Sequence, residues 1–466
     1  MSESTVDIAV IGAGAAGLMA GIAAARAQRA AGQTPSVVCL DGARTIGAKI
    51  LVAGGGRCNV THHAVDESAY AGSSRPAIRS VLRRFDVPQT VEFFRELGVH
   101  LKREDTGKLF PTTDRARTVV DALLAALNAS GAELWHPWRV DRVERAETSG
   151  FGAAASPDPA DTADTADTAD PADRTDGTFV IHGHRPAGRG GESGPPLTLR
   201  TRRVIMATGG RSLPKSGSDG HGYEIVRGLG HRLTPRVFPS LVPLRLAEGD
   251  VLRELSGLAV PAGVEVRSAS GKRVARFEND LLCTHFGLSG PAALDASRWW
   301  IDAFMDDRAA EVVIDWIPSL PADELDRALQ RTERRGVVNY LKEHLPERLA
   351  RALCGRANVD PGAPMGSLRK TARRDLVVAL KEGPVPVTGN RGYLFAEVTA
   401  GGVPLKELTL RSMESKVTAG LHLCGEICDV DGRIGGFNFQ WAWASGHVAG
   451  EAAAASLAAS SDVGGG

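Results

Sequence analysis

The chain has 466 residues, of which 43% are hydrophobic and 24% charged, with six cysteines and a formal net charge of zero. This length and composition are ordinary for a globular protein with two or three domains and a sizeable core. Six cysteines in this length exclude a disulfide scaffold, so we expect a reducing, cytoplasmic setting.

The first motif is a short apolar stretch that runs into a glycine turn. Residues 5–11 are predicted as a strand, and Gly12-x-Gly14-x-x-Gly17 leads into an Ala-rich predicted helix. This order is that of a dinucleotide-binding βαβ unit: Gly12 makes the turn, Gly14 lets a pyrophosphate approach, and Gly17 packs the helix on the strand. The free N–H groups at the helix start favour phosphates.

The same stretch is not predicted to enter a membrane. Residues 8–25 carry no charge, as a membrane span would. However, acidic Glu3 and Asp7 precede them, where a signal peptide carries basic residues. We therefore expect no membrane segment.

A second strand is predicted at residues 36–41 and ends on Asp41, 24 residues after Gly17. An acid at this place takes the ribose hydroxyls of adenosine. Strand, glycine turn, helix, strand and acid in this order together predict a nucleotide site.

Three consecutive glycines follow in the stretch GAKILVAGGGRCNVTH at 47–62. Residues 54–56 suit neither a helix nor a strand. They fit a backbone that lies against a flat ligand or a phosphate, with Lys49 and Arg57 as charge partners. The alternative is a flexible surface loop.

The middle of the chain alternates helices and strands. Residues 75–128 are predicted helical in two pieces, with a loop at 107–116 that offers Thr or Asp as an N-cap. Residues 139–205 are predicted as a β-meander with two long hairpin loops. Repeats of Asp-Thr-Ala leave almost nothing to bury there, so disorder is expected over about 147–200. A strand at 202–210 ends in Ala-Thr-Gly-Gly, and a loop-rich exit follows.

Short strands over 235–320 predict an inserted β-rich domain. The stretch THFGLSGPAALDAS at 284–297 predicts a sharp turn before a helix. His285 at its start is either a candidate proton donor or a structural histidine.

Residues 321–382 are predicted helical and basic. Between 327 and 374 there are twelve Lys or Arg and four Asp or Glu, a local net charge of +8. This segment is either the solvated face of a helical lobe or a docking surface for a polyanion such as RNA. The candidate RNA contacts are Arg334, Arg335, Arg373 and Arg374.

The closing stretch, residues 420–450, returns to glycine-rich turns. A strand to Cys424 is followed by Gly425-Glu426, a loop with Asp429 and Asp431, Gly435-Gly436 and a long Ala-rich helix. A late glycine–acid turn ahead of a helix is the second half of many FAD sites, where the helix start favours charge on the flavin. GSDGHGY at 217–223 lacks the preceding strand of a second fingerprint, so NAD(P)H would reach the flavin without its own Rossmann domain.

Six blocks resemble the signatures of the bacterial aminoacetone-oxidase-like flavoproteins, which are NAD(P)/FAD-dependent oxidoreductases. The blocks are GAGAAG at 12–17, AGGGRCNVT at 53–61, ATGGRSLPKSGSDGHGY at 207–223, THFGLSGPAALDAS at 284–297, AEVTAGGV at 396–403 and CGEICDVDGRIGGFNFQWAWASGHVAG at 424–450. Activities attributed to that family are aminoacetone oxidation, C=C reduction of a bile-acid intermediate and dihydrouridine formation in ribosomal RNA. The resemblance covers nearly the whole chain except 147–200 and the tail.

The resemblance implies an α/β fold in which a glutathione-reductase-like, discontinuous Rossmann domain binds FAD and carries an inserted β-rich and helical domain. The implied division is a first FAD-binding part at 1–212, a β-rich domain at 213–320, a basic helical subdomain at 321–387, a second FAD-binding part at 388–460 and a flexible tail at 461–466.

The resemblance also implies which residues meet the cofactor. The implied set is Gly12, Ala13, Gly14, Ala15, Ala16, Gly17, Asp41, Lys49, Gly55, Gly56, Arg57, Cys58, Asn59, Thr208, Gly209, Gly425, Glu426, Gly435, Gly436 and Asn438. This sequence departs from the family where Asp41 replaces the usual Glu, which leaves the ribose contact the weakest assignment. No His, Cys and carboxylate set has metal-ligand spacing, so no metal site is expected.

These features predict an FAD-dependent oxidoreductase that transfers a hydride at flavin N5. The first hypothesis is NAD(P)H-driven reduction of a conjugated C=C bond, with a uridine of ribosomal RNA as a target that suits the basic lobe. One alternative is an amine oxidase of the aminoacetone type that uses O2, and another is a non-catalytic RNA-binding protein stabilised by FAD. Candidates for the proton donor are Cys58, His285 and His62. The oligomeric state stays open.

Overall fold

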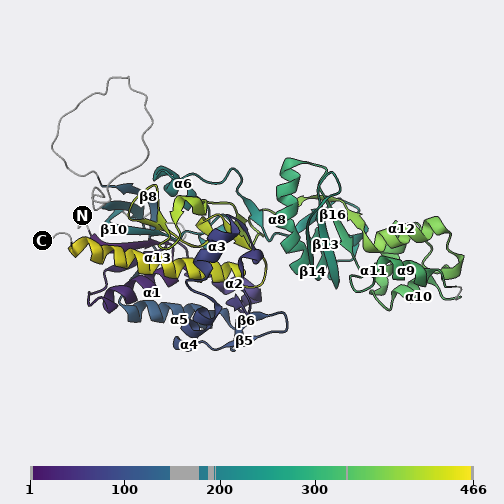
Figure 1. The fold of residues 1–466 in the computed structure, drawn as a ribbon, viewed down its shortest axis with the longest axis horizontal. Helices are drawn as coiled ribbons and strands as arrows, with labels where there is room; N and C mark the ends of the chain where they lie inside the picture. Colours follow the sequence, from purple (N-terminus) through teal and green to yellow (C-terminus); the bar gives the residue numbers. More distant parts are fainter. Residues whose placement is uncertain (1–3, 147–177, 187–193, 195, 332–333, 463–466) are drawn as a thin grey trace, which may run out of the picture.

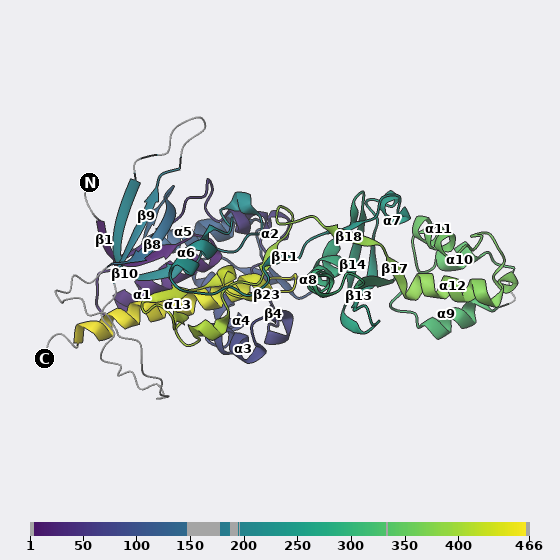
Figure 2. The ribbon, with the colours of Figure 1, turned by 90° about the horizontal axis from the view of Figure 1, so that it is seen from above.

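The computed structural model describes residues 4–146, 178–186, 194, 196–331 and 334–462. The disorder expected over about 147–200 and the flexible tail expected at 461–466 fall largely on residues outside this description. The molecule is elongated: an α/β domain forms one end, a β-rich domain lies in the middle, and a group of short helices forms the other end (Figures 1 and 2).

The α/β domain is built on a sheet whose central strands are parallel. They pair in the order β22-β10-β1-β2-β7. Their bounds are β1 Ser4–Ile11, β2 Val37–Leu40, β7 Glu133–Trp135, β10 Pro196–Met206 and β22 Leu421–Leu423. Residues 37–40 are buried throughout, as expected for a parallel strand that helices cover on both sides.

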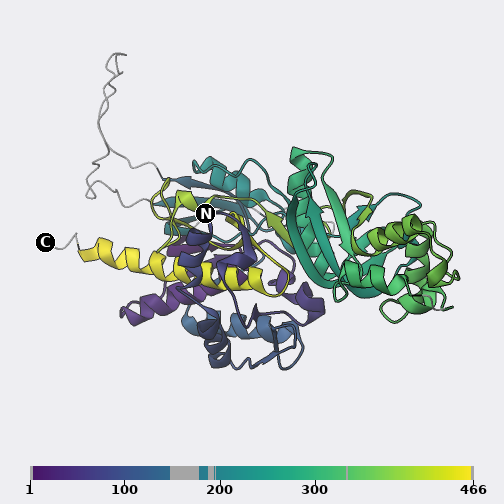
Figure 3. The same ribbon diagram turned by 45° about the vertical axis from the view of Figure 1, so that its right-hand side comes forward.

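The first and last helices of the chain lie side by side (Figure 3). They are α1 (Ala15–Ala30) and α13 (Phe437–Asp462). A Cβ atom built on Gly446 would lie 2.4 Å from the carbonyl oxygen of Ala16, and one on Gly450 would lie 2.2 Å from that of Ala20. The two helices therefore pack backbone against backbone, and this contact joins the closing stretch to the glycine turn at the start of the chain.

The predicted β-meander is present in the structure. Strand β8 (Arg139–Arg145) pairs antiparallel with β9 (Phe179–His184), which pairs antiparallel with β10. The fold class expected from the sequence, a Rossmann-type domain with an inserted β-rich domain, is confirmed.

Three local predictions were wrong. Residues 107–116 are not a plain loop, because β6 (Lys108–Pro111) pairs with β3 (Thr61–His62) and β5 (Leu101–Arg103). Helix α5 (Ala116–Ser130) follows without a side-chain cap from Thr or Asp. The exit after residue 210 folds into the 3-10 helix η3 (Pro214–Ser216) and helix α6 (His221–Gly228). Asp431 lies in strand β23 (Val430–Gly432), which pairs with β4 (Tyr70–Gly72), and not in a loop.

The inserted domain is an antiparallel sheet that curves toward closure. Its strands pair in the order β17-β16-β13-β14-β15-β12-β18. Their bounds are β12 Leu244–Leu246, β13 Ala259–Arg267, β14 Arg273–Thr284, β15 Gly287–Ser289, β16 Glu311–Asp315, β17 Gly383–Val385 and β18 Val387–Asn390. The two edge strands, β17 and β18, are separated by the single residue Pro386, so the edges of the sheet must approach each other. Helix α8 (Gly290–Asp306) packs on β13 and β14.

A cluster of helices extends the inserted domain away from the α/β domain (Figure 2). It consists of α9 Ala322–Leu329, α10 Val337–Leu341, α11 Glu347–Arg356 and α12 Lys370–Lys381. Ile314 of the sheet shares one hydrophobic core with Leu325 and Leu376 of these helices. A separate core fills the α/β domain, from Ile8 to Leu229 and from Val403 to Leu457. The chain thus builds two cores, the second inserted between the two halves of the first.

The contact between α1 and α13 predicts a specific sensitivity at Gly450. We expect Gly450→Ala to lower the free energy of unfolding by about 1–3 kcal/mol, because the added methyl group overlaps the backbone of Ala20. Gly228→Ala is the matched control: a Cβ there meets no atom of the described residues within 4 Å, so the change should be neutral or slightly stabilising. Thermal melts of both variants measure the difference, and equal Tm values would contradict the packing.

Candidate active site

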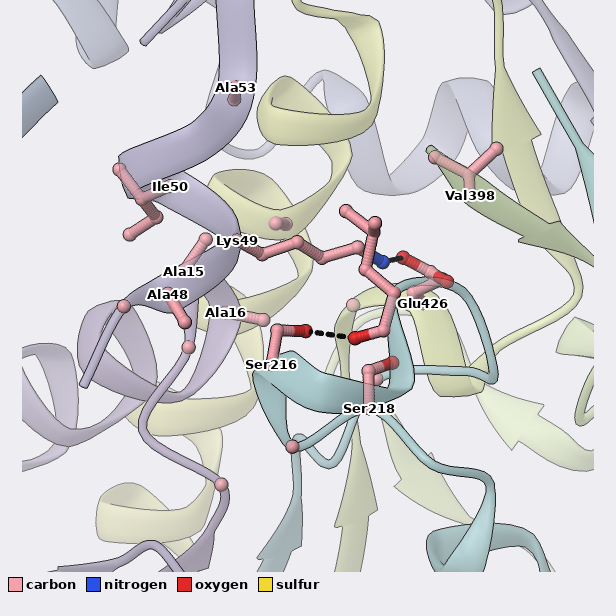
Figure 4. Close-up of a pocket in the computed structure, with 18 of the residues that line it drawn as sticks. Ala15, Ala16, Ala48, Lys49, Ile50, Ala53, Ser216, Ser218, Val398 and Glu426 are labelled. Atoms are coloured by element: carbon pink, nitrogen blue, oxygen red, sulfur yellow. Dashed lines mark hydrogen bonds and ion pairs between the residues drawn. The ribbon is translucent and has the colours of Figure 1, made fainter. Parts of the chain in front are cut away.

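A cavity of about 900 Å³ lies in the α/β domain at the side that faces the inserted domain. Most of its wall comes from four segments distant in sequence: the glycine turn, residues 41–59, residues 207–222 and residues 425–442. Residues 394–398 and a few single residues complete it. Figure 4 shows how helix α2 (Ala48–Gly56), the turn before α1 and the 3-10 helix η3 converge on it. The volume is that of a pocket for a cofactor-sized ligand.

The glycine turn has the backbone contacts that its spacing predicts. Gly12 has a φ of +100°, and a Cβ on it would lie 2.5 Å from the carbonyl oxygen of Ala207. A Cβ on Gly17 would lie 1.8 Å from the carbonyl oxygen of Gly12. Gly14 differs, because its Cβ would meet no atom of the described residues within 4 Å, and Gly14 lines the cavity. The first and third glycines close the turn, and the second leaves space for a ligand.

Asp41 holds this turn to the end of β2. Its carboxylate accepts the N–H of Ala13 at 2.7 Å and the N–H of Ala43 at 2.7 Å. Asp41 itself lies on the cavity wall, whereas Ala13 does not. The acid predicted for the ribose thus orients the loop around it and retains lone pairs toward the cavity.

The triple glycine leaves the helical conformation, as the sequence predicts. Within α2, Gly54 and Gly55 have φ values of 57° and 70°. A Cβ on Gly54 would lie 2.9 Å from the ring of Phe110, and the guanidinium of Arg57 stacks 4.0 Å from the centre of the same ring. Gly54, Arg57 and Asn59 line the cavity, whereas Gly55, Gly56 and Cys58 do not.

Lys49 and Glu426 form the centre of a polar clamp (Figure 4). The Lys49 ammonium donates to a Glu426 carboxylate oxygen at 2.5 Å and to the Ser212 hydroxyl at 2.9 Å. The other Glu426 oxygen accepts the Ser212 hydroxyl at 2.8 Å and the Thr399 N–H at 3.0 Å. Glu426, predicted to bind the cofactor, therefore accepts three hydrogen bonds from protein groups.

The remaining predicted residues gather on the same wall. Lining the cavity are Ala15, Ala16, Thr208, Gly209, Gly425, Gly435, Gly436 and Asn438. The GSDGHGY segment lines it too, through Gly217, Ser218 and His221, so it belongs to this cavity. Gly17 packs behind the wall. The N-terminus of α13 reaches the wall through Asn438 and Phe439.

Unpartnered polar atoms show that this cavity suits a polar dinucleotide. The Asn59 Oδ1, Thr208 Oγ1 and Ser218 Oγ atoms are buried and have no hydrogen-bond partner among the described residues. All three residues line the cavity. A buried polar atom without a partner is costly. A ligand with hydroxyl, phosphate and ring nitrogen groups would satisfy them, as FAD would.

The three candidate proton donors, all in the described part of the chain, lie off the cavity wall. Burial raises the pKa of the Cys58 thiol to about 12. The half-buried His62 ring lies between the carbonyl oxygens of Ala64 and Thr106 and stacks on Phe437. His285 is exposed on the inserted domain beside Phe286.

Several cavity residues escaped the sequence reasoning. They are Lys108, Leu394, Phe395, Glu397 and Arg433. Glu397 lies in the block AEVTAGGV at 396–403. This block indicated the family, but the sequence did not identify Glu397 as a cavity residue. Asp295 of α8 accepts the N–H of Ile434, a cavity residue, at 2.8 Å, and burial raises its pKa to about 7.

The sheet, the glycine turn and the late glycine–acid turn on one cavity define an FAD-binding oxidoreductase. The chain belongs to the HI0933-like family: the HI0933-like Rossmann domain matches residues 6–164, and the HI0933-like barrel and H2TH domain matches residues 238–398.

Two curated relatives align along almost their whole length. A 3-dehydro-bile acid delta(4,6)-reductase of Clostridium scindens is 30% identical over 452 residues, which are 96% of this chain and 98% of the relative. A ribosomal RNA dihydrouridine synthase of Escherichia coli is 30% identical over 447 residues, 94% of this chain and 96% of the relative. The 3-ketosteroid delta1-dehydrogenase of Sterolibacterium denitrificans has a similar fold, with a TM-score of 0.50, 13% identity and coverage of 97% of this chain and all of that one. Among the described residues no helix is long and apolar enough to span a membrane.

The geometry of Gly14 predicts that a larger side chain at this position weakens FAD binding without destabilising the fold. We expect Gly14→Val to fold with a Tm close to that of the wild-type protein without cofactor, because Gly14 has an extended backbone and open space around its Cβ. The branched side chain would then occupy the cavity, so FAD affinity should fall at least about tenfold, or 1.4 kcal/mol. Fluorescence titration with FAD measures this, and unchanged affinity would contradict the assignment of this turn to the pyrophosphate.

Proposed function

We propose that this protein reduces a conjugated C=C bond in a pyrimidine ring of RNA, with NAD(P)H as the source of reducing equivalents. The distribution of charge on the helical cluster carries this proposal. The two curated relatives support the reaction class, since one is named as a reductase and the other as a dihydrouridine synthase.

When bound, FAD supplies hydride transfer at flavin N5. The chain's own residues would bind and orient it. The glycine turn and Asp41 would hold the dinucleotide end, and the clamp of Lys49 and Glu426 would fix the middle of the cavity. The N-terminus of α13 on the wall favours negative charge nearby by about 0.3–2 kcal/mol.

Most cations of the helical cluster are neutralised within the protein. Arg335 pairs with Glu343 at 2.6 Å, and Arg373 pairs with Asp326 at 2.7 Å. These two predicted RNA contacts therefore stabilise the cluster first. Further ion pairs are Arg327–Asp323, Arg351–Glu347, Lys342–Glu347, Arg356–Asp250 and Lys381–Asp315.

Six exposed cations of the helical cluster have no ion pair within the described part of the chain. One is Arg348, which donates to the carbonyl oxygen of Glu254 at 2.9 Å. The other five are Arg331, Arg334, Arg369, Lys370 and Arg374. They lie just after α9 and at the start of α12, two helices that pack together and that the Arg373–Asp326 pair joins. Unpaired cations gathered on one surface attract phosphates and supply the salt-dependent part of RNA binding.

The position of these cations favours a long ligand. The helical cluster lies at the end of the molecule opposite to the α/β domain that holds the cavity (Figures 1 and 2). A single ligand can contact both the cation cluster and the cavity only if it is long, and a large folded RNA is long enough. A small substrate would leave the cation cluster without a role.

A second candidate is reduction of a small apolar enone, which the cavity mouth favours. The exposed fractions of Val52, Leu394 and Phe395 are 59%, 56% and 44%, and all three line the cavity. An apolar ring would bury this surface. A nucleobase would bury the same surface by stacking on Phe395.

The reaction class is tested with the holoprotein under anaerobic conditions. We expect NADPH or NADH to bleach the visible absorption of the flavin, and ribosomal RNA transcribed in vitro to restore it while dihydrouridine appears by mass spectrometry. A steroid enone serves as the parallel substrate for the second candidate. Absence of bleaching with both nucleotides would contradict the reductase, bleaching by aminoacetone alone would support an amine oxidase, and RNA binding without any turnover would support a non-catalytic role.

The docking surface is tested by removing two of the free cations. We expect Arg334→Ala with Arg374→Ala to weaken RNA binding about tenfold at low salt and to reduce the slope of log affinity against log salt by about 1 per contact. The control pair is Arg95→Ala with Arg117→Ala, exposed arginines of the α/β domain with ion pairs of their own. Equal losses in both pairs, or no loss, would remove this docking surface.

A further inference from the structure

Glu397 is a carboxylate that the fold holds in place on the cavity wall. It precedes β19 (Val398–Ala400), and its N–H donates to the carbonyl oxygen of Leu241 at 3.1 Å. Its own carbonyl oxygen accepts the Ser212 hydroxyl at 3.3 Å. The backbone is therefore fixed on both sides, next to the clamp around Glu426.

The side chain of Glu397 has no hydrogen bond or ion pair among the described residues, in contrast to Glu426. Glu397 is exposed to solvent through the open cavity that it lines. The protein packed around the rest of the residue raises its pKa by desolvation, and the positive charges of Lys49 and Lys108 partly offset that effect.

The charged groups around this carboxyl come from several elements. Lys49 of α2 is already engaged by Glu426, whereas Lys108 of β6 faces Glu397 and Asp295 together. The negative charge of Glu397 adds to the raised pKa of Asp295 of α8, whereas Arg433 after β23 lowers it. Two carboxyls and two cations, Lys108 and Arg433, thus influence one another, and all of them except Asp295 line the cavity.

We propose that Glu397 is the catalytic acid that gives a proton to the substrate, an inference that rests on the proposed reduction. FAD, when bound and reduced, would supply the hydride for a C–H bond at one carbon of the C=C bond. The proton of the Glu397 carboxyl forms a C–H bond at the other carbon, the π electrons making that bond. The carboxylate regains a proton from solvent, and NAD(P)H restores the reduced cofactor.

The chemistry of the site suits this role. An acid transfers its proton better as its pKa rises toward the working pH, and the pKa of Glu397 is raised in that direction. The cations then stabilise the carboxylate that remains. Of the acids and thiols considered, Cys58 is a poor donor because its pKa is about 12 and it lies off the wall.

The test compares Glu397→Gln with Glu248→Gln as holoproteins, since Glu248 is also an exposed glutamate but does not line the cavity. By anaerobic stopped flow, we expect Glu397→Gln to be reduced by NADPH at the wild-type rate and to be reoxidised by RNA or enone substrate about 10²–10⁴-fold more slowly. Glu397→Asp should recover part of the rate. Equal reoxidation rates in Glu397→Gln and wild type would overturn the inference.

A second readout does not depend on turnover. In the oxidised holoprotein without substrate, a carboxyl that titrates above the ordinary range should appear by difference infrared spectroscopy, vanish in Glu397→Gln and persist in Glu248→Gln. If wild type bleaches with NADPH but no C=C substrate reoxidises it, the proposed function fails even where this titration is present; if the titration is unchanged in Glu397→Gln, the assignment to Glu397 fails by itself.

Discussion

The ion pair between Lys49 and Glu426 joins parts of the chain 377 residues apart, and the cavity depends on it. The pair draws in Ser212 and the N–H of Thr399, so four segments meet at one point. Breaking one partner of such a partly enclosed pair would leave the other charge unpaired, which costs more than the pair itself gains. The helix contact at Gly446 and Gly450 acts in the same sense, because it holds the last helix against the first. A discontinuous domain needs both, since the inserted residues between its halves contribute a separate core.

The parts of the site that follow from local backbone chemistry could be predicted from the sequence. Glycines at fixed spacing, an acid after the second strand and a triple glycine each report a conformation that few residues adopt, and the structure has these conformations at Gly12, Gly54 and Gly55. Two of the predictions that failed, at residues 107–116 and at Asp431, concern strand pairing at a distance. Nothing within residues 107–116 indicates a strand, because the partners of β6 lie at residues 61–62 and 101–103.

The burial and pairing of individual side chains could not be predicted from the sequence, for a physical reason. Cys58 stands between the cavity residues Arg57 and Asn59 in sequence, yet its side chain is buried in the core. Likewise, a local charge of +8 counts cations without their partners: Arg335 and Arg373 belong to ion pairs, while Arg334 and Arg374 stay unpaired among the described residues. Local charge and sequence motifs indicate which segment forms a site. The fold determines which side chains of that segment are buried and which are paired with other residues.

Two glutamates near the same turn illustrate how the fold divides roles. Glu426 takes the cation of Lys49 and two donors, and it works as a structural anchor. Glu397 is left without a partner in the described chain, and its pKa rises. Such a group lowers stability: above the ordinary pKa of a glutamate the unfolded chain ionises while the folded protein retains the proton, so the folded state is penalised as the pH rises from that value toward the raised one. Such a loss of folding stability is typical of residues that serve a functional site. A carboxyl with a raised pKa and no partner in the described chain, on the wall of the cavity, is placed to deliver a proton to a bound substrate.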